Sequence, residues 1–441
     1  MNRQLDNRAR PGTVAPAPQV RGLGQLLTGA SVLLICAATL TPQAGHSQAS
    51  AFCILCGSLG GVDAVLNVLL FLPLGIGLAL SGARVTSTML AILFFSISIE
   101  VAQFLVISGR DSSIGDVLTN VVGGATGFAL VHWFETWHNP SRRAALALSV
   151  CWIVGWLAIQ LLSSYGFAPA FPSTRYYGQI ARVFANMATF GGRVLSATID
   201  TVSVPDFGFS KTRQLHDLLE NGAVVGAVVI PAGPTPRVAP IIRVADDRQR
   251  QIVLLGQDRA DMVFGVHTGA ANLRLRPPLF RLTGVFPPEG GAAGLRMSDT
   301  LDVRARYRAA GVEIRADSRD NAKSRHIVIS SALGWILILP QQWYVEGTRT
   351  ELFLSFVWLA TLLFPLGYWG FLAATSESSE TQRRFVPALA ALAIVLFVGL
   401  VLLPHSFGLE SPSFGAWLAV TIGVAAGAAL ARAKQGSPAG S

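Results

Sequence analysis

The sequence is poor in charge and poor in cysteine, and each shortage excludes a class of protein. Only 13% of its 441 residues are charged, whereas 51% are hydrophobic. An ordinary soluble domain has about 25% charged residues. These proportions exclude a chain that is soluble throughout and predict a polytopic membrane protein. The four cysteines are too few for a disulfide scaffold.

A basic tract and a cleavable signal are also missing. The formal net charge is +9, but its Lys and Arg residues divide between the flanks of apolar runs and one long insert. We therefore expect no nucleic-acid partner. Residues 1–20 are polar and rich in Pro and Arg, and they lack the layout of a signal peptide. This segment is predicted to be a disordered cytoplasmic tail.

Eight apolar runs are long enough to cross a hydrocarbon core of about 30 Å as helices. They are Gly22–Leu40, Val62–Leu80, Thr86–Ile107, Ile114–Phe134, Ala144–Leu162, Leu352–Ala373, Val386–Leu403 and Phe414–Ala431. The Lys and Arg residues of the short connecting segments fall on one side if these runs alternate, with Arg110 as the exception. The positive-inside rule then predicts cytoplasmic termini, with residues 433–441 as the C-terminal tail. Five runs precede the long insert, which is therefore predicted to be extracytoplasmic.

The insert, residues 165–348, has short β-like runs separated by turn residues. Leu301–Tyr307 alternates apolar and polar residues, as a strand with one buried face does. Without a convincing amphipathic helix between the runs, the pattern favours an all-β sandwich. By strand number, size and layout, the insert resembles a concanavalin or laminin-G type jelly roll.

Acidic turns in this insert leave two interpretations open. Asp246, Asp247, Asp258 and Asp261 could supply carboxylate ligands to calcium, or they could be solvated turn residues. No other cofactor is expected. Cys53 and Cys56, in a predicted outer loop, are interpreted as a local disulfide or as two interfacial thiols.

Polar residues recur in three neighbouring apolar runs, at spacings of three and four that place each pair on one helix face. The pairs are Asp63 and Asn67, Glu100 and Gln103, and Asp116 and Asn120. Such residues are costly inside a bilayer unless they face protein or water, so they predict one shared polar site. Arg110 is placed to neutralise its carboxylates.

Local structural roles are alternatives for some of these residues. Ser113 and Asp116 have the spacing of a helix cap, so Asp116 has a capping interpretation beside the functional one. Gly123, Gly124 and Gly127 are expected to let helices approach closely. Glu100 favours function, because it lies deep in an apolar run where no local backbone group is expected to need it as a cap.

Taken in order, these motifs resemble the VanZ-like membrane domain. They are Asp63-x3-Asn67-x3-Phe71-x-Pro73-x-Gly75, Glu100-x2-Gln103, Gly109-Arg110, and Ser113-x2-Asp116-x3-Asn120-x2-Gly123-Gly124-x2-Gly127. The resemblance assigns residues 21–164 to a VanZ-like transmembrane domain and leaves residues 349–432 as additional C-terminal spans. It implies the bacterial inner membrane and cell envelope. The founding member is linked to glycopeptide resistance, but the family has no defined biochemical activity.

Two hypotheses of function follow. The first is an envelope protein with a carbohydrate-binding periplasmic domain, acting in surface polysaccharide or cell-wall metabolism or in glycopeptide resistance. The alternative is a membrane enzyme whose Glu100, Arg110 and Asp116 act on a lipid-linked glycan. Expected partners are membrane lipid and a glycan or lipid-linked saccharide, while the oligomeric state stays open. A transporter is disfavoured, because the sequence is expected to contain no internal repeat.

Overall fold

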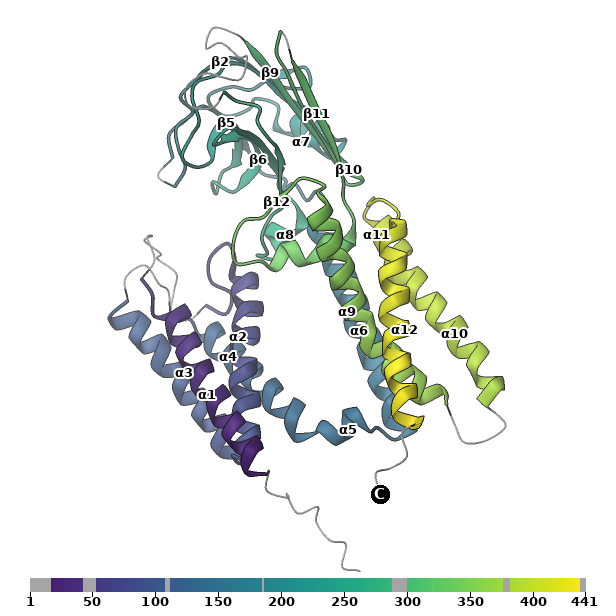
Figure 1. The fold of residues 1–441 in the computed structure, drawn as a ribbon. Helices are drawn as coiled ribbons and strands as arrows, with labels where there is room; N and C mark the ends of the chain where they lie inside the picture. Colours follow the sequence, from purple (N-terminus) through teal and green to yellow (C-terminus); the bar gives the residue numbers. More distant parts are fainter. Residues whose placement is uncertain are drawn as a thin grey trace, which may run out of the picture. The chain divides into compact units, whose positions relative to one another are not determined.

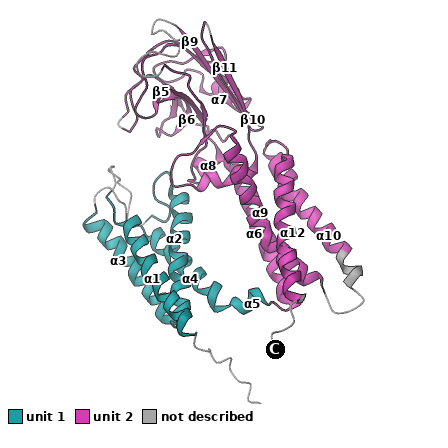
Figure 2. Ribbon diagram, viewed as in Figure 1, with its two compact units in different colours: residues 1–139 teal, residues 140–441 magenta. Residues whose placement is uncertain are grey.

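Two compact units make up the structure, a computed structural model. It describes residues 17–42, 53–107, 112–184, 186–287, 300–319, 321–375 and 381–436. The units comprise residues 1–139 and 140–441 (Figure 2). Eight helices of the described residues are long and apolar enough to span a membrane, one for each predicted run. The division places the fifth of these helices in the second unit.

The first unit is built on an N-terminal bundle of four helices, α1 to α4, followed by the short helix α5 (Figure 1). Their bounds are α1 Pro18–Thr39, α2 Gly60–Leu80, α3 Val85–Leu105, α4 Ile114–His132 and α5 Phe134–His138. In the close contact between α2 and α4, Gly123 lies against Val68 and Gly127 against Leu72. A Cβ atom added to Gly127 would lie 2.0 Å from the carbonyl oxygen of Leu72. The expected packing role of these glycines is confirmed. Helices α2 and α4 are parallel, because the contact four residues further along α4 is also four residues further along α2.

The second unit holds a C-terminal bundle of four spans: α6, α9, α10 with its continuation, and α12 (Figure 1). Their bounds are α6 Arg142–Phe167, α9 Arg349–Ala374, α10 Thr381–Phe397, the π-helical segment η2 Val398–Leu402, α11 Leu403–Ser406 and α12 Phe414–Gly436. Helices α9 and α12 are also parallel, with Gly423 against Ala360 and Gly427 against Phe364. Helix α6 runs antiparallel to α9, since Arg142 Nε donates to the carbonyl of Ala373 at 3.0 Å and Trp152 Nε1, further along α6, donates to that of the earlier residue Leu362 at 2.6 Å.

The two bundles repeat one another. The glycine contacts of α12 with α9 have the same spacing as those of α4 with α2, and each first helix of the pair contains a proline, Pro73 or Pro365. The sequences around these contacts correspond without a gap, SIGDVLTNVVGGATGFAL (113–130) with SFGAWLAVTIGVAAGAAL (413–430), and LFLPLG (70–75) with LLFPLG (362–367). The prediction that the chain contains no internal repeat was therefore wrong.

The β domain is inserted between the first and second helices of the C-terminal bundle and consists of two six-stranded sheets (Figure 1). The strand order is β1-β5-β6-β7-β8-β12 in the first sheet and β11-β10-β9-β4-β2-β3 in the second. The strands are β1 Tyr176–Ile180, β2 Arg193–Ile199, β3 Val202–Ser203, β4 Val224–Ile230, β5 Ala239–Asp246, β6 Gln251–Asp258, β7 Asp261–Val266, β8 Leu279–Leu282, β9 Leu301–Arg308, β10 Gly311–Asp317, β11 Ala322–Val328 and β12 Tyr344–Val345. Neighbouring strands are antiparallel, apart from the parallel pair β12 and β8.

Both sheets contribute to one hydrophobic core. Phe264 and Phe280 from the first sheet share it with Val303 and Tyr307 from the second. The rings of Phe280 and Tyr307 meet edge to face with centroids 5.7 Å apart. Two sheets around a common core agree with the predicted β architecture, whereas the jelly-roll type stays a prediction.

One amphipathic helix was missed. Helix α7, Thr212–Glu220, buries Leu215 and Leu219 in the core of the β domain. The expectation of no amphipathic helix was wrong because α7 has only nine residues, and its three leucines, Leu215, Leu218 and Leu219, cover a single helical turn. The helix α8, Gly269–Asn272, and the 3₁₀ helix η1, Ser331–Ile338, complete the domain.

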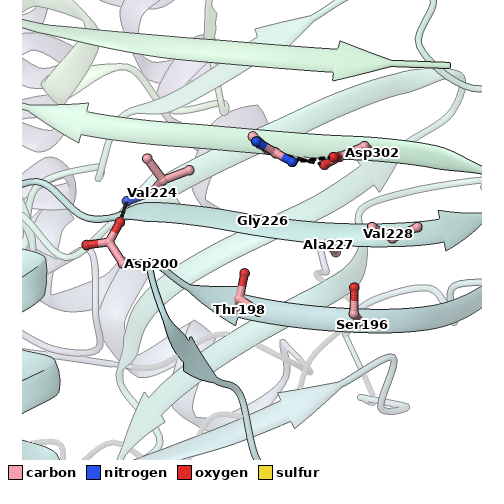
Figure 3. A pocket seen from close by; sticks show the side chains of 9 residues that line it. Ser196, Thr198, Asp200, Val224, Gly226, Ala227, Val228 and Asp302 are labelled. Carbon is pink, nitrogen blue, oxygen red and sulfur yellow. Dashed lines mark hydrogen bonds and ion pairs between the residues drawn. The ribbon is translucent and has the colours of Figure 1, made fainter.

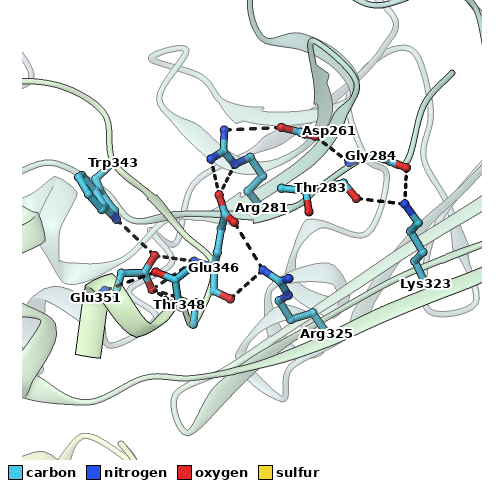
Figure 4. Close-up of polar contacts among 11 residues, drawn as sticks. Asp261, Arg281, Thr283, Gly284, Lys323, Arg325, Trp343, Glu346, Thr348 and Glu351 are labelled. Carbon is cyan, nitrogen blue, oxygen red and sulfur yellow. Dashed lines mark hydrogen bonds and ion pairs between the residues drawn. The ribbon is translucent and has the colours of Figure 1, made fainter. Parts of the chain in front are cut away.

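The β domain is fixed to the C-terminal bundle by buried and partly buried polar contacts. Tyr307 Oη donates to the carbonyl of Phe167 at 2.5 Å, and burial raises the pKa of this tyrosine. On the other side, Arg281 and Arg325 both pair with Glu346 in the segment that leads into α9 (Figure 4). Arg281 comes from the first sheet and Arg325 from the second, so Glu346 ties both sheets to the start of α9.

Candidate functional site

Asn67 and Asp116 join α2 to α4 in the N-terminal bundle. Asn67 Nδ2 donates to Asp116 Oδ1 at 2.9 Å. The backbone N–H of Asp116 donates to Ser113 Oγ at 3.0 Å, which caps α4. Asp116 thus belongs to the helix cap through its backbone and to the polar cluster through its side chain. The capping interpretation is confirmed, whereas the functional interpretation of Asp116 stays a prediction.

Glu100 lies beside the same cap. Its side chain is buried and accepts a hydrogen bond from the backbone N–H of Ser113 at 2.8 Å. The sequence predicted no local backbone partner for this carboxylate, and the partner in the structure lies 13 residues further along the chain, at the N-cap of α4. Ser113 donates its N–H to the Glu100 carboxylate and accepts with its Oγ from the backbone N–H of Asp116, so it links α3 to the first turn of α4. The predicted cation Arg110 lies outside the described residues.

The remaining amides point to other helices. Gln103 Nε2 donates to the carbonyl of Thr39 at 2.9 Å, and Asn120 Nδ2 donates to Ser96 Oγ at 2.9 Å. Gln103 Oε1 and Asn120 Oδ1 are buried and have no hydrogen-bond partner in the described part of the chain. Asp63 is exposed near the start of α2. Five of the six residues thus make the described contacts that link the four helices, and two of them, Glu100 and Asp116, contact Ser113.

An apolar groove passes beside Glu100 on the outside of the bundle. Its volume is about 250 Å³, and its walls come from α3, α4 and the residues just before α4. The lining residues are Ile97, Glu100, Val101, Phe104, Ser112, Ser113, Ile114 and Val117. The groove therefore combines a surface suited to hydrocarbon with one acidic residue and two serines in its lining.

The loop before α2 closes against this end of the bundle. Cys53 and Cys56 form a disulfide, which confirms the first of the two interpretations. The N–H of Gly115 donates to the carbonyl of Cys53 at 3.3 Å. A Cβ atom at Gly115 would collide with the backbone of Ile54, so the glycine is required for the loop to pack on α4.

The four calcium candidates do not meet. Asp246 and Asp247 lie in the β5–β6 hairpin, whereas Asp258 and Asp261 lie in the β6–β7 hairpin at the opposite end of β6. Asp246 is fully buried and accepts hydrogen bonds from the N–H groups of Arg248 and Arg250 and from the Arg250 guanidinium. Asp261 pairs with Arg281 and accepts from the N–H of Gly284. Protein donors thus occupy these two carboxylates.

A different group of metal-ligand types lies on α7. His216, Asp217 and Glu220 place one ligand atom each within 4.8 Å of the others. The Nε2 atom of His216 lies 3.1 Å from the carbonyl oxygen of Phe171, so it serves as a hydrogen-bond donor. A nitrogen that carries this proton is not available as a metal ligand.

A polar groove, which was not predicted from the sequence, crosses the outer face of the second sheet of the β domain (Figure 3). Its volume is about 350 Å³. The lining residues are Ser196, Thr198, Asp200, Val224, Gly226, Ala227, Val228, Asp302 and Arg304. A volume near the lower end of the range for small-molecule sites suits a compact polar ligand.

The strand register explains how this groove forms. Gly226 of β4 lies between Thr198 of β2 and Arg304 of β9, so the middle strand contributes no side chain there. Asp302 holds Arg304 in a two-point ion pair at 3.0 and 2.6 Å. Asp200 accepts a hydrogen bond from the N–H of Val224 at 2.8 Å. Hydroxyl, carboxylate and guanidinium groups therefore flank a floor of backbone in fixed positions.

One sequence signal could have identified this face. The alternation of Leu301–Tyr307 predicts a strand, and it also places Asp302, Arg304 and Arg306 together on the outer side. The other half of the groove comes from β2 and β4, which lie far from β9 in the sequence. Their pairing is a property of the sheet order and is not visible in any single strand.

Comparison with known proteins finds one family. Residues 15–135 match the family model described as VanZ/LLP1, a range that contains the whole N-terminal bundle. This part of the chain is similar to that family, in agreement with the resemblance seen in its motifs. No curated protein and no solved structure gives a significant match.

Proposed function

We propose that this chain is an integral protein of the bacterial inner membrane whose β domain binds a surface or cell-wall glycan outside the cytoplasm. The observation that carries the proposal is the polar groove on the second sheet. The VanZ/LLP1 match and the eight apolar helices support a role in the membrane and the envelope. A role in surface polysaccharide or cell-wall metabolism, or in glycopeptide resistance, belongs to this proposal.

The chemistry of the groove favours a neutral glycan. Sugar hydroxyl groups both donate and accept hydrogen bonds, and Asp200, Asp302 and Arg304 offer acceptors and donors at fixed positions. Asp302 and Arg304 neutralise each other, which leaves the groove without the positive field that a polyanion would need. None of the described residues that line it is aromatic, so recognition would rest on hydrogen bonds.

The location of this groove also fits a glycan. Because it lies on a sheet face, its backbone groups are already paired within the sheet, and an added peptide strand would find no free edge there. The Lys and Arg distribution supports an extracytoplasmic β domain, the side on which envelope glycans are found.

Glycan binding is tested on the full chain in detergent. The purified protein would be applied to an array of neutral hexose, N-acetylated aminosugar and acidic oligosaccharides, and the affinity for a retained glycan measured by titration calorimetry. Asp302→Ala removes an acceptor and frees Arg304, so we expect the affinity to fall at least about tenfold, or about 1.4 kcal/mol.

Asp317→Ala is the matched control. Asp317 pairs with Arg315 on the neighbouring strand as Asp302 pairs with Arg304, but it does not line the groove. Equal loss of affinity in both variants would assign the effect to the charge of the sheet face. Retention of acidic oligosaccharides alone, or of none, would refute the proposal.

The groove beside Glu100 supports a second candidate function, the membrane enzyme acting on a lipid-linked glycan. Glu100 lines this groove among apolar residues of α3 and α4, so a lipid in the groove would lie beside it. The acid-base role has weaker support, because Glu100 and Asp116 accept hydrogen bonds from Ser113 and Asn67. Loss of turnover of a lipid-linked saccharide in Glu100→Gln, with unchanged glycan binding by the β domain, would favour this candidate.

A further inference from the structure

A cavity of about 250 Å³ lies where the β domain meets the C-terminal bundle. Its floor is buried and is formed by Ala332 and Leu333 of η1, Leu359 of α9 and Ala416 of α12. Its mouth is bordered by exposed residues of the first turns of α9 and α12, among them Leu352 and Gly415. The cavity belongs to neither the polar groove nor the polar cluster.

The repeat shows what this cavity corresponds to. Aligned through their prolines, α2 and α9 place Leu359 at the position of Asn67 and Ser355 at that of Asp63. Aligned through their glycines, α4 and α12 place Ala416 at the position of Asp116. The cap is kept, because Ser413 Oγ accepts from the N–H of Ala416 as Ser113 Oγ accepts from that of Asp116. The cavity therefore occupies the place that the Asn67–Asp116 pair occupies in the N-terminal bundle.

The two copies differ in how this place is filled. In the N-terminal bundle, the Asn67–Asp116 hydrogen bond spans it and Ile54 closes against Gly115. In the C-terminal bundle, Gly415 has open space around its Cα, with Ser413 Oγ as the nearest atom to an added Cβ at 3.7 Å. Replacement of a carboxylate by the methyl group of Ala416 thus leaves an open and mainly apolar space.

Two polar side chains of α9 that line the cavity, Glu351 and Ser355, already have hydrogen-bond partners. Glu351 accepts hydrogen bonds from the N–H groups of Glu346, Gly347 and Thr348 and from Trp343 Nε1 (Figure 4). Ser355 Oγ accepts from Trp335 Nε1 at 3.1 Å. These contacts compensate the buried carboxylate, so the cavity favours an apolar occupant.

Exposed apolar side chains surround the mouth of the cavity and indicate that an occupant would come from the bilayer. Leu352 is 63% exposed and Phe353 65%, and on α12 Phe414 is 82% exposed. Both helices are candidate membrane spans, so these side chains belong to the surface that hydrocarbon covers. Ser411 and Ser413 add hydroxyl groups at the mouth. Hydrocarbon from the bilayer can thus enter while a polar head group stays at the hydroxyl-bearing edge.

We propose that this cavity binds one acyl chain of a membrane phospholipid. The acyl chain fills the space that the polar pair fills in the other copy of the bundle. Because η1 of the β domain forms part of the floor, the lipid packs against the domain and both helices at once. Bound lipid therefore holds the β domain on the C-terminal bundle.

Native mass spectrometry of the full chain, released from a mild detergent, tests this site. The wild-type chain is expected to keep one phospholipid, identified by its mass, at collision energies that remove loosely held lipid. Ala416→Phe fills the cavity and should abolish this retention. Gly415→Leu fills it from the mouth without touching the helix contact, and it serves if Ala416→Phe does not fold.

Leu418→Phe is the matched control, because Leu418 lies on the same helix but is exposed and does not line the cavity. Retention in Leu418→Phe and loss in Gly415→Leu or Ala416→Phe would support the site. Equal retention in all variants, loss in all of them, or no retained lipid in the wild type would overturn it. A retained species with the mass of a polyprenyl lipid would overturn the assignment to a phospholipid.

Discussion

The N-terminal and C-terminal bundles pack their helices through the same glycines but bury different residues at one end. Asn67 and Asp116 of the first correspond to Leu359 and Ala416 of the second. Glu100, counted back from the cap at Ser113, corresponds to Leu400, counted back from Ser413. Leu400 is buried in the core of its bundle, as expected of an apolar replacement.

The difference separates what the fold requires from what it does not. Because the C-terminal bundle forms the same parallel glycine contact without the polar pair, this contact does not depend on Asn67 or Asp116. Buried polar residues are costly in a membrane protein, and those that the packing does not need are candidates for function. The comparison therefore favours a functional role for the polar cluster of the N-terminal bundle.

The shared glycine contact should carry the largest effect. Gly127→Val and Gly427→Val each place a Cβ atom within 2.0 to 2.1 Å of a carbonyl oxygen on the partner helix, so the helices must separate. We expect each change to destabilise its bundle by about 3 kcal/mol, measured by thermal unfolding in detergent. Gly29→Val, where an added Cβ meets nothing within 4 Å, is the control. A large effect in one bundle alone would break the equivalence.

Replacing Asn67 and Asp116 by the residues of the C-terminal bundle tests whether these two side chains are coupled. Asn67→Leu or Asp116→Ala alone leaves a polar partner without its hydrogen bond, at a cost of about 2 kcal/mol each. The double variant has the residues found at Leu359 and Ala416, and it should cost less than the sum of the single changes. A double-mutant cycle on thermal stability measures this coupling. Strict additivity would show that the two side chains act separately.

Loss of a side-chain cap should destabilise the start of α9, whereas the start of α2 has no such cap to lose. Glu351 caps the segment before α9, whereas its counterpart Leu59 makes no side-chain cap. Glu351→Ala should destabilise the C-terminal unit by about 1 to 2 kcal/mol, seen as a lower thermal midpoint. Glu313→Ala, on the exposed face of β10, should leave the midpoint unchanged. No difference between these variants would argue against the cap.

The smallest effect is expected from pH and concerns the β domain alone. Burial lowers the pKa of His267 from its ordinary value of 6.5, while its hydrogen bond to the Ala170 carbonyl opposes this change. Below about pH 6.5, His267 is protonated in the unfolded chain but still neutral in the folded one. The free energy of unfolding should therefore fall as the pH decreases towards the lowered pKa, by at most about 1.4 kcal/mol per pH unit. His267→Gln should flatten the dependence of the thermal midpoint on pH between about pH 7 and pH 5. An unchanged slope in this variant would contradict the prediction.

The spans could be predicted because hydropathy is local, and the polar pairs because spacing on a helix is local. The contact of Glu100 with the N–H of Ser113 was not predictable, since it joins residues 13 apart in the sequence on two different helical elements. The repeat was not predicted from the sequence because the polar residues of the first copy, such as Asp116 and Asn120, are replaced by Ala416 and Val420 in the second. The glycine spacing that remains becomes informative only when the partner helix is known.

The insertion point of the β domain has a mechanical consequence. Helix α6 enters the domain and α9 leaves it, and η1 contacts both helices near these ends, since Gly334 lies against Ser163 of α6 and Trp335 Nε1 donates to Ser355 Oγ of α9. The domain is thus anchored by two covalent connections at one place, where a single linker would leave it free to swivel. A ligand held on the outer face of its second sheet would stay at a nearly constant distance from the C-terminal bundle. Its effective concentration would then be raised for any reaction at that distance.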